Sequence, residues 1–171
     1  MRTDEFDFVL PESLIAQHPP ALRGTSRLLH VHSDELSDKS FADLAELLRA
    51  DDLLILNDTR VIKARLFGTK KTGGQLEVLV ERVLNNHEVL AQVRASRSPL
   101  AGSDLLLAEH INAKVLGREG EFFHLRFDAA QTVWEWLEQY GRLPLPPYIT
   151  HAADGDDEQR YQTVFARNDG A

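Results

Sequence analysis

The chain has 171 residues, of which 43% are apolar and 27% charged, and this composition is typical of a folded domain rather than a disordered segment. The formal net charge of −8 disfavours extensive nucleic-acid contact, and the absence of cysteine excludes disulfides and favours a cytoplasmic setting. The acidic first residues predict no secretion signal, and no apolar run approaches the roughly 20 residues needed to cross a bilayer.

The first third of the chain predicts alternating strands and helices. Phe6, Phe8 and Leu10 alternate with polar residues, as in a strand, and Pro11 suits the first turn of a helix that ends before Pro19. The remaining predicted elements are a strand over Leu28–Val31, a helix capped by Ser40 that extends to Leu48, and a strand over Leu53–Leu56 buried on both faces.

Four polar residues, Asn57 to Arg60, follow the predicted buried strand. Three of them are types that bond their own backbone, so the segment suits a connecting turn. Polar groups at the end of a buried strand also suit a binding site, and the pattern alone leaves both interpretations open. Beyond them, Ile62, Ala64 and Leu66 alternate with Lys63 and Arg65, which predicts a second strand with one basic face.

Short strands at regular spacing predict a small antiparallel barrel in the middle of the chain. They cover Leu76–Glu81, Glu88–Arg94, Leu105–Leu107, Lys114–Leu116 and Phe122–Phe127. The pattern therefore predicts an α/β fold with an inserted small antiparallel β-barrel domain. The expected boundaries are 1–60 for the first part of the larger domain, 61–149 for the barrel with one helix, and 150–171 for the return to the larger domain.

A helix over Gln131–Tyr140 is predicted next, with Gly141 as its end. Trp136 lies on its apolar face, where a core position is favoured over stacking on a base. The proline-rich stretch Leu143–Ile149 suits a rigid linker and also a wall of a cleft that presents Tyr148, and the two interpretations are compatible. After it we expect an acidic loop over Asp154–Glu158 and a short helix or strand over Arg160–Phe165.

Basic residues concentrate in one segment, from Asn57 to Arg97, where eight Lys and Arg face four acids. An acidic protein with one basic segment can hold RNA there, although a solvated strand face has the same composition. The seven histidines show no metal-ligand spacing, so no metal is expected.

Five stretches, in order along the chain, carry a resemblance. They are Leu10–Ala16, Ser26–Leu29, Asn57–Gly68, Leu143–Ile149 and Arg160–Phe165. The chain resembles the S-adenosylmethionine:tRNA ribosyltransferase-isomerases of queuosine biosynthesis. In that family a Pro-Thr-Ala-Gly-Leu-His-Phe motif and much of the larger domain follow the last of these stretches. The resemblance therefore implies that this sequence is the amino-terminal part of a longer protein, with an incomplete larger domain. We expect this part to be inactive alone, to expose apolar surface and to self-associate.

The resemblance implies transfer of the ribosyl group of S-adenosylmethionine to the aminomethyl-deazaguanine base (preQ1) at the wobble position of tRNA, and its isomerisation, giving epoxyqueuosine-tRNA with release of adenine and methionine. S-adenosylmethionine is then a consumed substrate and no other cofactor is implied; the whole protein is expected to be a monomer that uses neither metal nor membrane.

The residue assignments follow from the same resemblance. Asp58 is the candidate catalytic base or ribose-hydroxyl acceptor, and Arg60 the partner of an anionic group. Asn57, Thr59 and Tyr148 would bind substrate. Phosphates of tRNA would lie against Lys63, Arg65, Arg94 and Arg97, although Ala95 stands where the family often has proline, which weakens the assignment of Arg94 and Arg97.

Two other classes remain to be distinguished. A non-catalytic RNA- or protein-binding β-barrel module is not excluded by the composition. A methyltransferase is disfavoured because the sequence lacks a glycine-rich turn between a strand and a helix.

Overall fold

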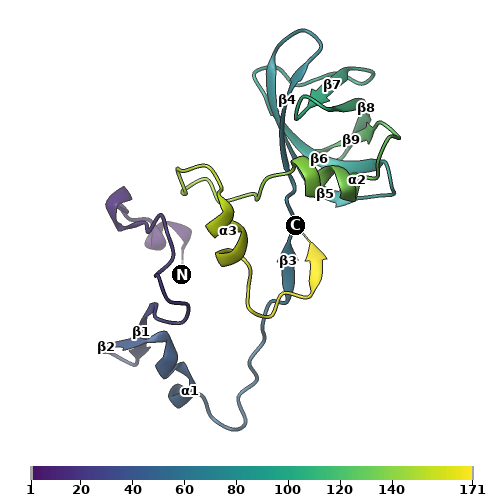
Figure 1. Ribbon diagram of the computed structural model, residues 1–171. Coiled ribbons are helices and arrows are strands. Elements are labelled where there is room, and N and C mark those ends of the chain that lie inside the picture. Colours follow the sequence, from purple (N-terminus) through teal and green to yellow (C-terminus); the bar gives the residue numbers. More distant parts are fainter. Residues whose placement is uncertain (1, 171) are drawn as a thin grey trace. The chain divides into compact units, whose positions relative to one another are not determined.

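The computed structural model describes residues 2–170, and the chain forms two units (Figure 1). One unit contains residues 2–56 with Pro147–His151; the other contains Asn57–Pro146 with residues 152–170. The second unit holds the barrel, and each unit is described by itself.

The first unit consists of short elements. Its 3-10 helices are η1 (Thr3–Phe6), η2 (Glu12–Leu14) and η3 (Phe41–Asp43); β1 (Arg27–His32) and β2 (Glu35–Ser40) form an antiparallel hairpin, and α1 (Leu44–Leu47) follows η3. The predicted cap is confirmed, because Ser40 and Asp43 form a capping box in which the Ser40 N–H donates to Asp43 Oδ2 at 2.8 Å.

Two predicted strands of this unit are wrong. Glu5–Leu10 has no strand and begins inside η1, while the helix expected from Pro11 is only the single turn η2. Leu53–Leu56 is neither a strand nor buried: Leu53 is 85% exposed and Ile55 is 83% exposed. A run of apolar residues indicates a tendency to be buried, but a strand also needs a hydrogen-bonding neighbour. The residues described here give these two segments no such neighbour.

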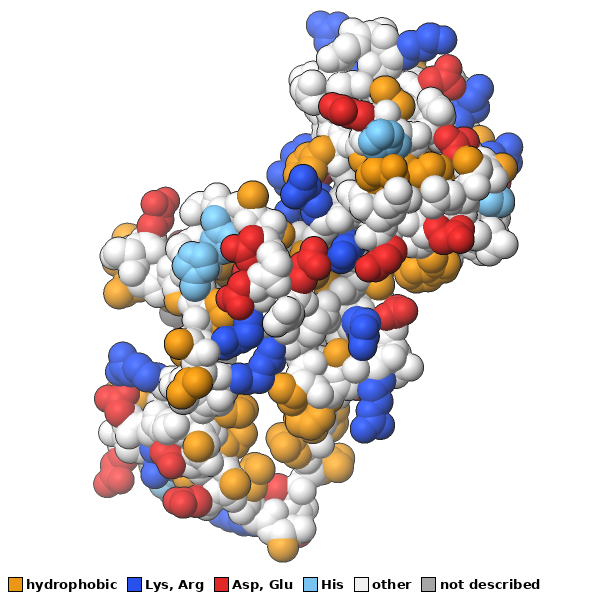
Figure 2. Space-filling model, viewed as in Figure 1, with side chains coloured by type: hydrophobic (Ala, Val, Ile, Leu, Met, Phe, Trp, Pro, Cys, Tyr) orange, Lys and Arg blue, Asp and Glu red, His pale blue; other side chains and the backbone are white. Residues whose placement is uncertain are grey.

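The first unit has no buried side chain among residues 2–56. Phe8, Leu14, Leu22 and Leu36 are each more than two-thirds exposed. Figure 2 shows many hydrophobic side chains on the surface in the lower part of the view. This unit therefore lacks a core of its own.

The predicted barrel is confirmed and is closed, with six antiparallel strands in the spatial order β4-β5-β6-β9-β8-β7 and with β7 pairing β4. The strands are β4 (Arg65–Lys70), β5 (Gln75–Val83), β6 (Glu88–Ala95), β7 (Asp104–Leu107), β8 (Ile111–Glu119) and β9 (Phe122–Phe127). Closure leaves none of these strands with an open edge.

Alternating side chains fill the barrel. Leu76, Val78 and Val80 of β5 are at most 5% exposed, whereas Glu77 between them faces outward. Burial of each such aliphatic side chain contributes roughly 1.5–3 kcal/mol to folding. Gly68 lies where β4 closes against β7, and a Cβ there would overlap the Leu106 carbonyl and approach Leu107 Cα to 2.9 Å. The seam therefore requires glycine.

Helix α2 (Val133–Tyr140) covers one end of the barrel and shares its core through Val133, Trp136 and Leu137. Trp136 is 6% exposed, so the core interpretation of this tryptophan is confirmed. Thr132 caps the helix in a capping box with Glu135. The Glu135 carboxylate accepts hydrogen bonds from the Thr132 N–H at 2.8 Å and from its hydroxyl at 2.7 Å, and these bonds lower the pKa of Glu135.

The chain leaves the barrel beside the point where it enters. Gly141 ends α2 as predicted, and a Cβ there would overlap the carbonyl oxygens of Lys63 and Leu137. The next residue, Arg142, exchanges two backbone hydrogen bonds with Arg65, of 2.8 and 3.1 Å.

Three further elements belong to this unit. β3 (Thr59–Val61) pairs in parallel with β10 (Asn168–Gly170), and α3 (Gly155–Arg160) lies between Pro147–His151 and β10 in sequence. The loop predicted over Asp154–Glu158 is wrong, because Asp154 caps α3 and forms a capping box with Asp157. The helix or strand predicted over Arg160–Phe165 is also wrong, since α3 ends at Arg160.

Candidate functional site

The signature segment Asn57–Arg60 begins with a turn and ends in a strand, since Thr59 and Arg60 belong to β3. Asn57 Oδ1 accepts a hydrogen bond from the Thr59 N–H at 2.8 Å, which is an Asx turn. This bond fixes the residue between them and starts β3 at Thr59. The turn interpretation is therefore confirmed for Asn57 and Asp58 and is wrong for Thr59 and Arg60, which lie in β3.

The segment 167–170 supports Asp58. The Asp58 carbonyl accepts the N–H groups of Arg167 at 2.7 Å and Asn168 at 3.3 Å. The side-chain amide of Asn168 donates to Asp58 Oδ2 at 2.9 Å. Oδ1 has no hydrogen-bond partner among the described residues, so one carboxylate oxygen is oriented while the other can accept a bond from a ligand.

Arg60 is held more loosely than Asp58. Its Nε lies 3.9 Å from Asp169 Oδ1, and the two side chains are 62% and 58% exposed. An ion pair this long and this exposed stabilises little. The guanidinium can therefore turn toward an anionic ligand at small cost, and its planar donors suit a carboxylate or a phosphate.

Gln162 fixes the strand that follows. Its side-chain amide donates to the Val61 carbonyl and accepts from the Val61 N–H, both at 2.8 Å. The amide thus takes the place of a neighbouring strand along the side of β3 that faces away from β10.

A cavity of about 470 Å³ lies beside these residues. The signature strand contributes Arg60, Val61 and Ile62 to its wall, and Gln162 and Asp169 line it as well. Much of the remaining wall consists of side chains from α2 and α3, namely Trp134, Glu138 and Glu158. Its lining mixes one exposed tryptophan with both charge signs, which suits an organic ligand that carries polar groups.

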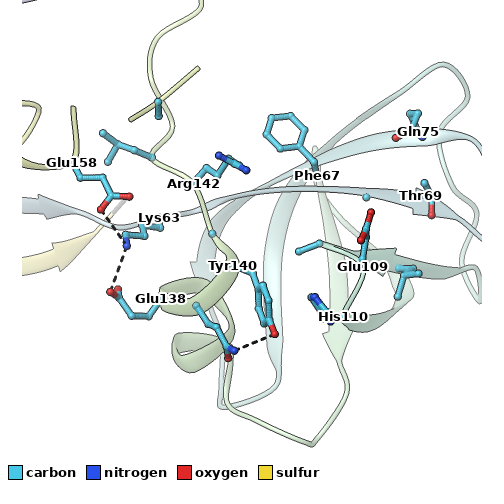
Figure 3. A pocket seen from close by; sticks show the side chains of 17 residues that line it. Lys63, Phe67, Thr69, Gln75, Glu109, His110, Glu138, Tyr140, Arg142 and Glu158 are labelled. Carbon is cyan, nitrogen blue, oxygen red and sulfur yellow. Dashed lines mark hydrogen bonds and ion pairs between the residues drawn. The ribbon is translucent and has the colours of Figure 1, made fainter. Parts of the chain in front are cut away.

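A second cavity, of about 610 Å³, extends along the outside of β4 (Figure 3). Phe67, Tyr140 and Arg142 line it together with Glu109 and His110, and the His110 and Tyr140 rings stack with centroids 4.7 Å apart.

Lys63 lines both cavities. Its ammonium lies 3.5 Å from a Glu138 oxygen and 3.3 Å from a Glu158 oxygen, and its side chain is 26% exposed (Figure 3). Two carboxylates therefore compete with any phosphate for this cation.

The four cations predicted to contact RNA lie in different surroundings. Arg65 pairs with Glu77 at 3.0 Å and donates to the Leu145 carbonyl at 3.2 Å, so this cation, like Lys63, is already bound within the protein. Arg94 and Arg97 are exposed. Within residues 2–170 neither of these two arginines has a carboxylate oxygen within 4.0 Å.

Tyr148 belongs to the other unit. The residue is 56% exposed, and its carbonyl accepts a hydrogen bond from Gln17 Nε2 at 2.9 Å. The same Gln17 side chain accepts from the Thr150 N–H at 2.8 Å, so it fixes the backbone on both sides of Ile149.

Sequence reasoning did not identify Gln162, Asn168 or Glu158 as neighbours of the signature segment. Gln162 lies within Arg160–Phe165, one of the five stretches that carry the resemblance. Its contact with Val61 spans 101 positions, and no local pattern predicts that contact. For α3 a signal was present, since Asp154 precedes Asp157 at the capping-box spacing. Across residues 2–170 the side chains of His, Asp and Glu form no group of three suited to a metal ion. No helix among these residues has the length and apolar character needed to span a bilayer.

A model of the queuosine biosynthesis protein family matches residues 3–171. Two similar relatives are named S-adenosylmethionine:tRNA ribosyltransferase-isomerase. The one from Aromatoleum aromaticum is 58% identical over 168 residues, which cover 98% of this chain and 49% of the relative. The one from Azoarcus sp. is 59% identical over 167 residues, which cover 98% and 48%. The chain therefore spans about half the length of these relatives.

A crystal structure of S-adenosylmethionine tRNA ribosyltransferase from Thermotoga maritima is 31% identical to this chain. It matches 80% of this chain and 48% of its own, with a TM-score of 0.41.

Proposed function

The chain belongs to the queuosine biosynthesis protein family, and from this premise we propose that it forms part of an S-adenosylmethionine:tRNA ribosyltransferase-isomerase. The enzyme transfers the ribosyl group of S-adenosylmethionine to the aminomethyl-deazaguanine base at the wobble position of tRNA and isomerises it. Epoxyqueuosine-tRNA is formed, and adenine and methionine are released. Identity of 58% over 98% of the chain is the observation that carries this proposal.

The reaction needs little from the protein beyond acid–base groups and positioning. The sulfonium of S-adenosylmethionine acidifies the neighbouring carbon–hydrogen bonds, so a carboxylate can serve as the base. Departure of adenine requires a proton donor, and both steps require shielding from water. The target base lies in an anticodon loop, where unstacked bases can enter a pocket.

Asp58 is the proposed base or acceptor for a ribose hydroxyl. The contact with Asn168 supports this role, because it orients the carboxylate through Oδ2 and leaves Oδ1 toward a ligand. Arg60 is proposed to bind an anionic group, either the methionine carboxylate or a phosphate. Its exposed side chain supports this role, as does its place in the wall of the 470 Å³ cavity.

Asn57 and Thr59 are proposed to shape the cleft, and Tyr148 to face a base of the substrate. The Asx bond between Asn57 and Thr59 supports a positioning role for the first two. Since the chain spans about half of its relatives, we expect the 171-residue protein alone to release no adenine.

The test uses the protein made from the complete native gene, with S-adenosylmethionine and tRNA carrying the preQ1 base. We expect adenine release that depends on this tRNA, and equal amounts of adenine and modified base. Binding of the tRNA without consumption of S-adenosylmethionine would instead support the non-catalytic module.

Two substitutions test the residue roles in that protein. Asp58→Asn should lower kcat by about 100-fold or more, the usual effect of losing an acid–base group. Arg60→Ala should raise the KM of one substrate by about tenfold, the value of one charged hydrogen bond. Glu81→Gln, an exposed change on the barrel, is the control. Near wild-type rates for both site variants would end the assignment.

A further inference from the structure

Five cations lie at or near one end of the barrel, and most of them have no carboxylate partner of their own. The β4–β5 hairpin carries Lys70 and Lys71, the loop after β6 carries Arg97, and Lys114 lies on β8. We name these four residues the barrel-end cluster, and Arg94 lies nearby on β6. Figure 2 shows several Lys and Arg side chains at the upper end of the barrel.

Contacts join the members of the cluster in pairs. Lys70 Nζ donates to the Arg97 carbonyl at 2.9 Å, which holds the hairpin against the loop after β6. Asp104 is shared by two lysines, with its oxygens 4.0 Å from Lys71 Nζ and 3.5 Å from Lys114 Nζ. The four cations thus form two pairs, one of which shares the Asp104 carboxylate.

The ion pairs within the cluster are weak. The Lys71 and Lys114 side chains are 83% and 57% exposed, and Asp104 is 51% exposed. Exposed pairs of this kind contribute little and are screened by salt. For Lys70 and Arg97, the described part of the chain places no carboxylate oxygen within 4.0 Å. The cluster is therefore a positive surface on a protein whose net charge is −8.

A groove of about 790 Å³ lies beside these cations. Four cations line it (Lys70, Lys71, Lys114 and Arg126), together with the two carboxylates Asp104 and Asp128. The strand register places Lys114 directly opposite Arg126. Each of the two has a carboxylate partner, since Arg126 binds Glu88 at 2.8 Å and Lys114 lies 3.5 Å from Asp104.

We propose that the barrel-end cluster docks the sugar–phosphate backbone of an RNA. The four cations are distributed over a hairpin, a loop and a strand, which matches a chain of phosphates better than a single phosphate. In contrast, Lys63 and Arg65 are bound to carboxylates. The proposal rests on the proposed function, in which the RNA is the tRNA substrate, and assigns the docking to residues outside the signature segment.

The experiment compares two double variants of the protein from the complete native gene. Lys71→Glu with Arg97→Glu alters the cluster, and the Arg97 contact with Lys70 is retained because it uses the backbone. Arg49→Glu with Arg82→Glu makes the same change in net charge at two exposed arginines outside the cluster. Binding of tRNA is measured over a range of salt concentrations, together with the KM of each substrate.

For the cluster variant we expect the KM of tRNA to rise by about tenfold or more, with the KM of S-adenosylmethionine unchanged. The slope of log K against log salt should fall by about two, since each phosphate contact contributes roughly 0.9. The control should remain within about twofold of wild type, and both variants should melt at the wild-type temperature.

Equal weakening by the two double variants would reveal a nonspecific charge effect and overturn the proposal. Unchanged tRNA binding by the cluster variant would also overturn it. A third contrary result is a cluster variant that loses binding to poly-glutamate but keeps binding to tRNA, which would assign the cluster to an acidic protein. Failure of the proposed function gives a separate signal. In that case wild-type protein releases no adenine, while salt-dependent RNA binding can still be measured.

Discussion

The side-chain amide of Gln162 binds both backbone polar groups of Val61, with two hydrogen bonds of 2.8 Å each. The two residues lie 101 positions apart, in two of the stretches that carry the family resemblance. Val61 directly follows Arg60, so this clamp determines where the signature segment ends and how β3 continues. It does so with a side chain, because β3 is only three residues long and has one strand neighbour.

Gln162→Ala should therefore destabilise the protein. Two hydrogen bonds are lost, and each contributes about 0.5–1.5 kcal/mol, so the free energy of unfolding should fall by about 1–3 kcal/mol. Urea denaturation measures it, with Gln92→Ala on an exposed face of β6 as the control. Gln162→Glu should be at least as harmful as alanine, because a carboxylate oxygen would face the Val61 carbonyl. Equal stability of wild type and both variants would show that the clamp is unimportant.

Gly141→Ala should destabilise the barrel by about 1–3 kcal/mol or more, the range for forcing an extra carbon into a packed site. The new Cβ would overlap the carbonyl oxygens of Lys63 and Leu137, and backbone atoms cannot rotate away. Gly117→Ala is the matched control, since a Cβ there meets no atom within 4 Å. Thermal melting of both variants tests this prediction, which fails if the two melt alike.

Acid should weaken the cap of α2. Hydrogen bonds from the Thr132 backbone and hydroxyl lower the pKa of Glu135 below its ordinary value of 4.5. A carboxylate whose pKa is lower in the folded state than in the unfolded state stabilises the fold when it is ionised. This stabilisation is fully present above the pKa of the unfolded state, and it is lost as the pH falls through the pKa of the folded state. Unfolding midpoints should therefore decline below about pH 4.5, the ordinary value from which this pKa is lowered.

Glu135→Gln should flatten part of that decline, because the amide can still accept a hydrogen bond but does not titrate. Thr132→Val should also flatten it, because the hydroxyl donor is lost while the backbone donor remains. A steeper decline in either variant than in wild type would contradict the assignment. Urea midpoints between pH 7 and pH 3 provide the comparison.

Proteolysis should distinguish the two units. Residues 2–56 include no buried side chain, whereas the barrel encloses a continuous core, so local opening costs little in the first unit. We expect brief digestion of the 171-residue protein to cleave within residues 2–56 and to leave a fragment that contains β4 to α2. Mass spectrometry identifies the products, and early cleavage inside the barrel would contradict the prediction.

The same exposed surface should cause self-association of the 171-residue protein. Phe8, Val9, Leu53 and Ile55 are each at least 73% exposed, and such surfaces bind one another in water. Light scattering should give a mass that rises with concentration, and a dye for apolar surface should bind. A clean monomer with one cooperative melting transition would refute this.

The barrel was predictable from the sequence because each strand carries its own signal. Alternation in Leu76–Glu81 and Phe122–Phe127 marks an inner and an outer face, and glycines mark the turns. Leu53–Leu56 carries an equally clear apolar signal, yet it is exposed here, since apolar character does not supply a pairing strand. The acidic run after Asp154 was misjudged because its charge suggested a loop, while its capping spacing indicated a helix.

Prediction of the site was limited in a similar way. The Asx turn at Asn57 followed from local chemistry, so it could be anticipated. The Asn168 contact with Asp58, the Gln162 clamp and the two carboxylates at Lys63 each join distant parts of the chain. Only the folded chain brings those partners together, and the pattern around Lys63 therefore suggested a free cation.

The two backbone hydrogen bonds between Arg65 and Arg142 have a consequence for how such a protein is assembled. A module whose first and last residues are neighbours can be added to a host loop, or removed from it, while the host chain keeps its path. The barrel meets this condition at one bridge and carries its core with it. We therefore expect that joining Ile62 to Leu143 through a short linker would remove the barrel and α2 while the flanking chain keeps its path.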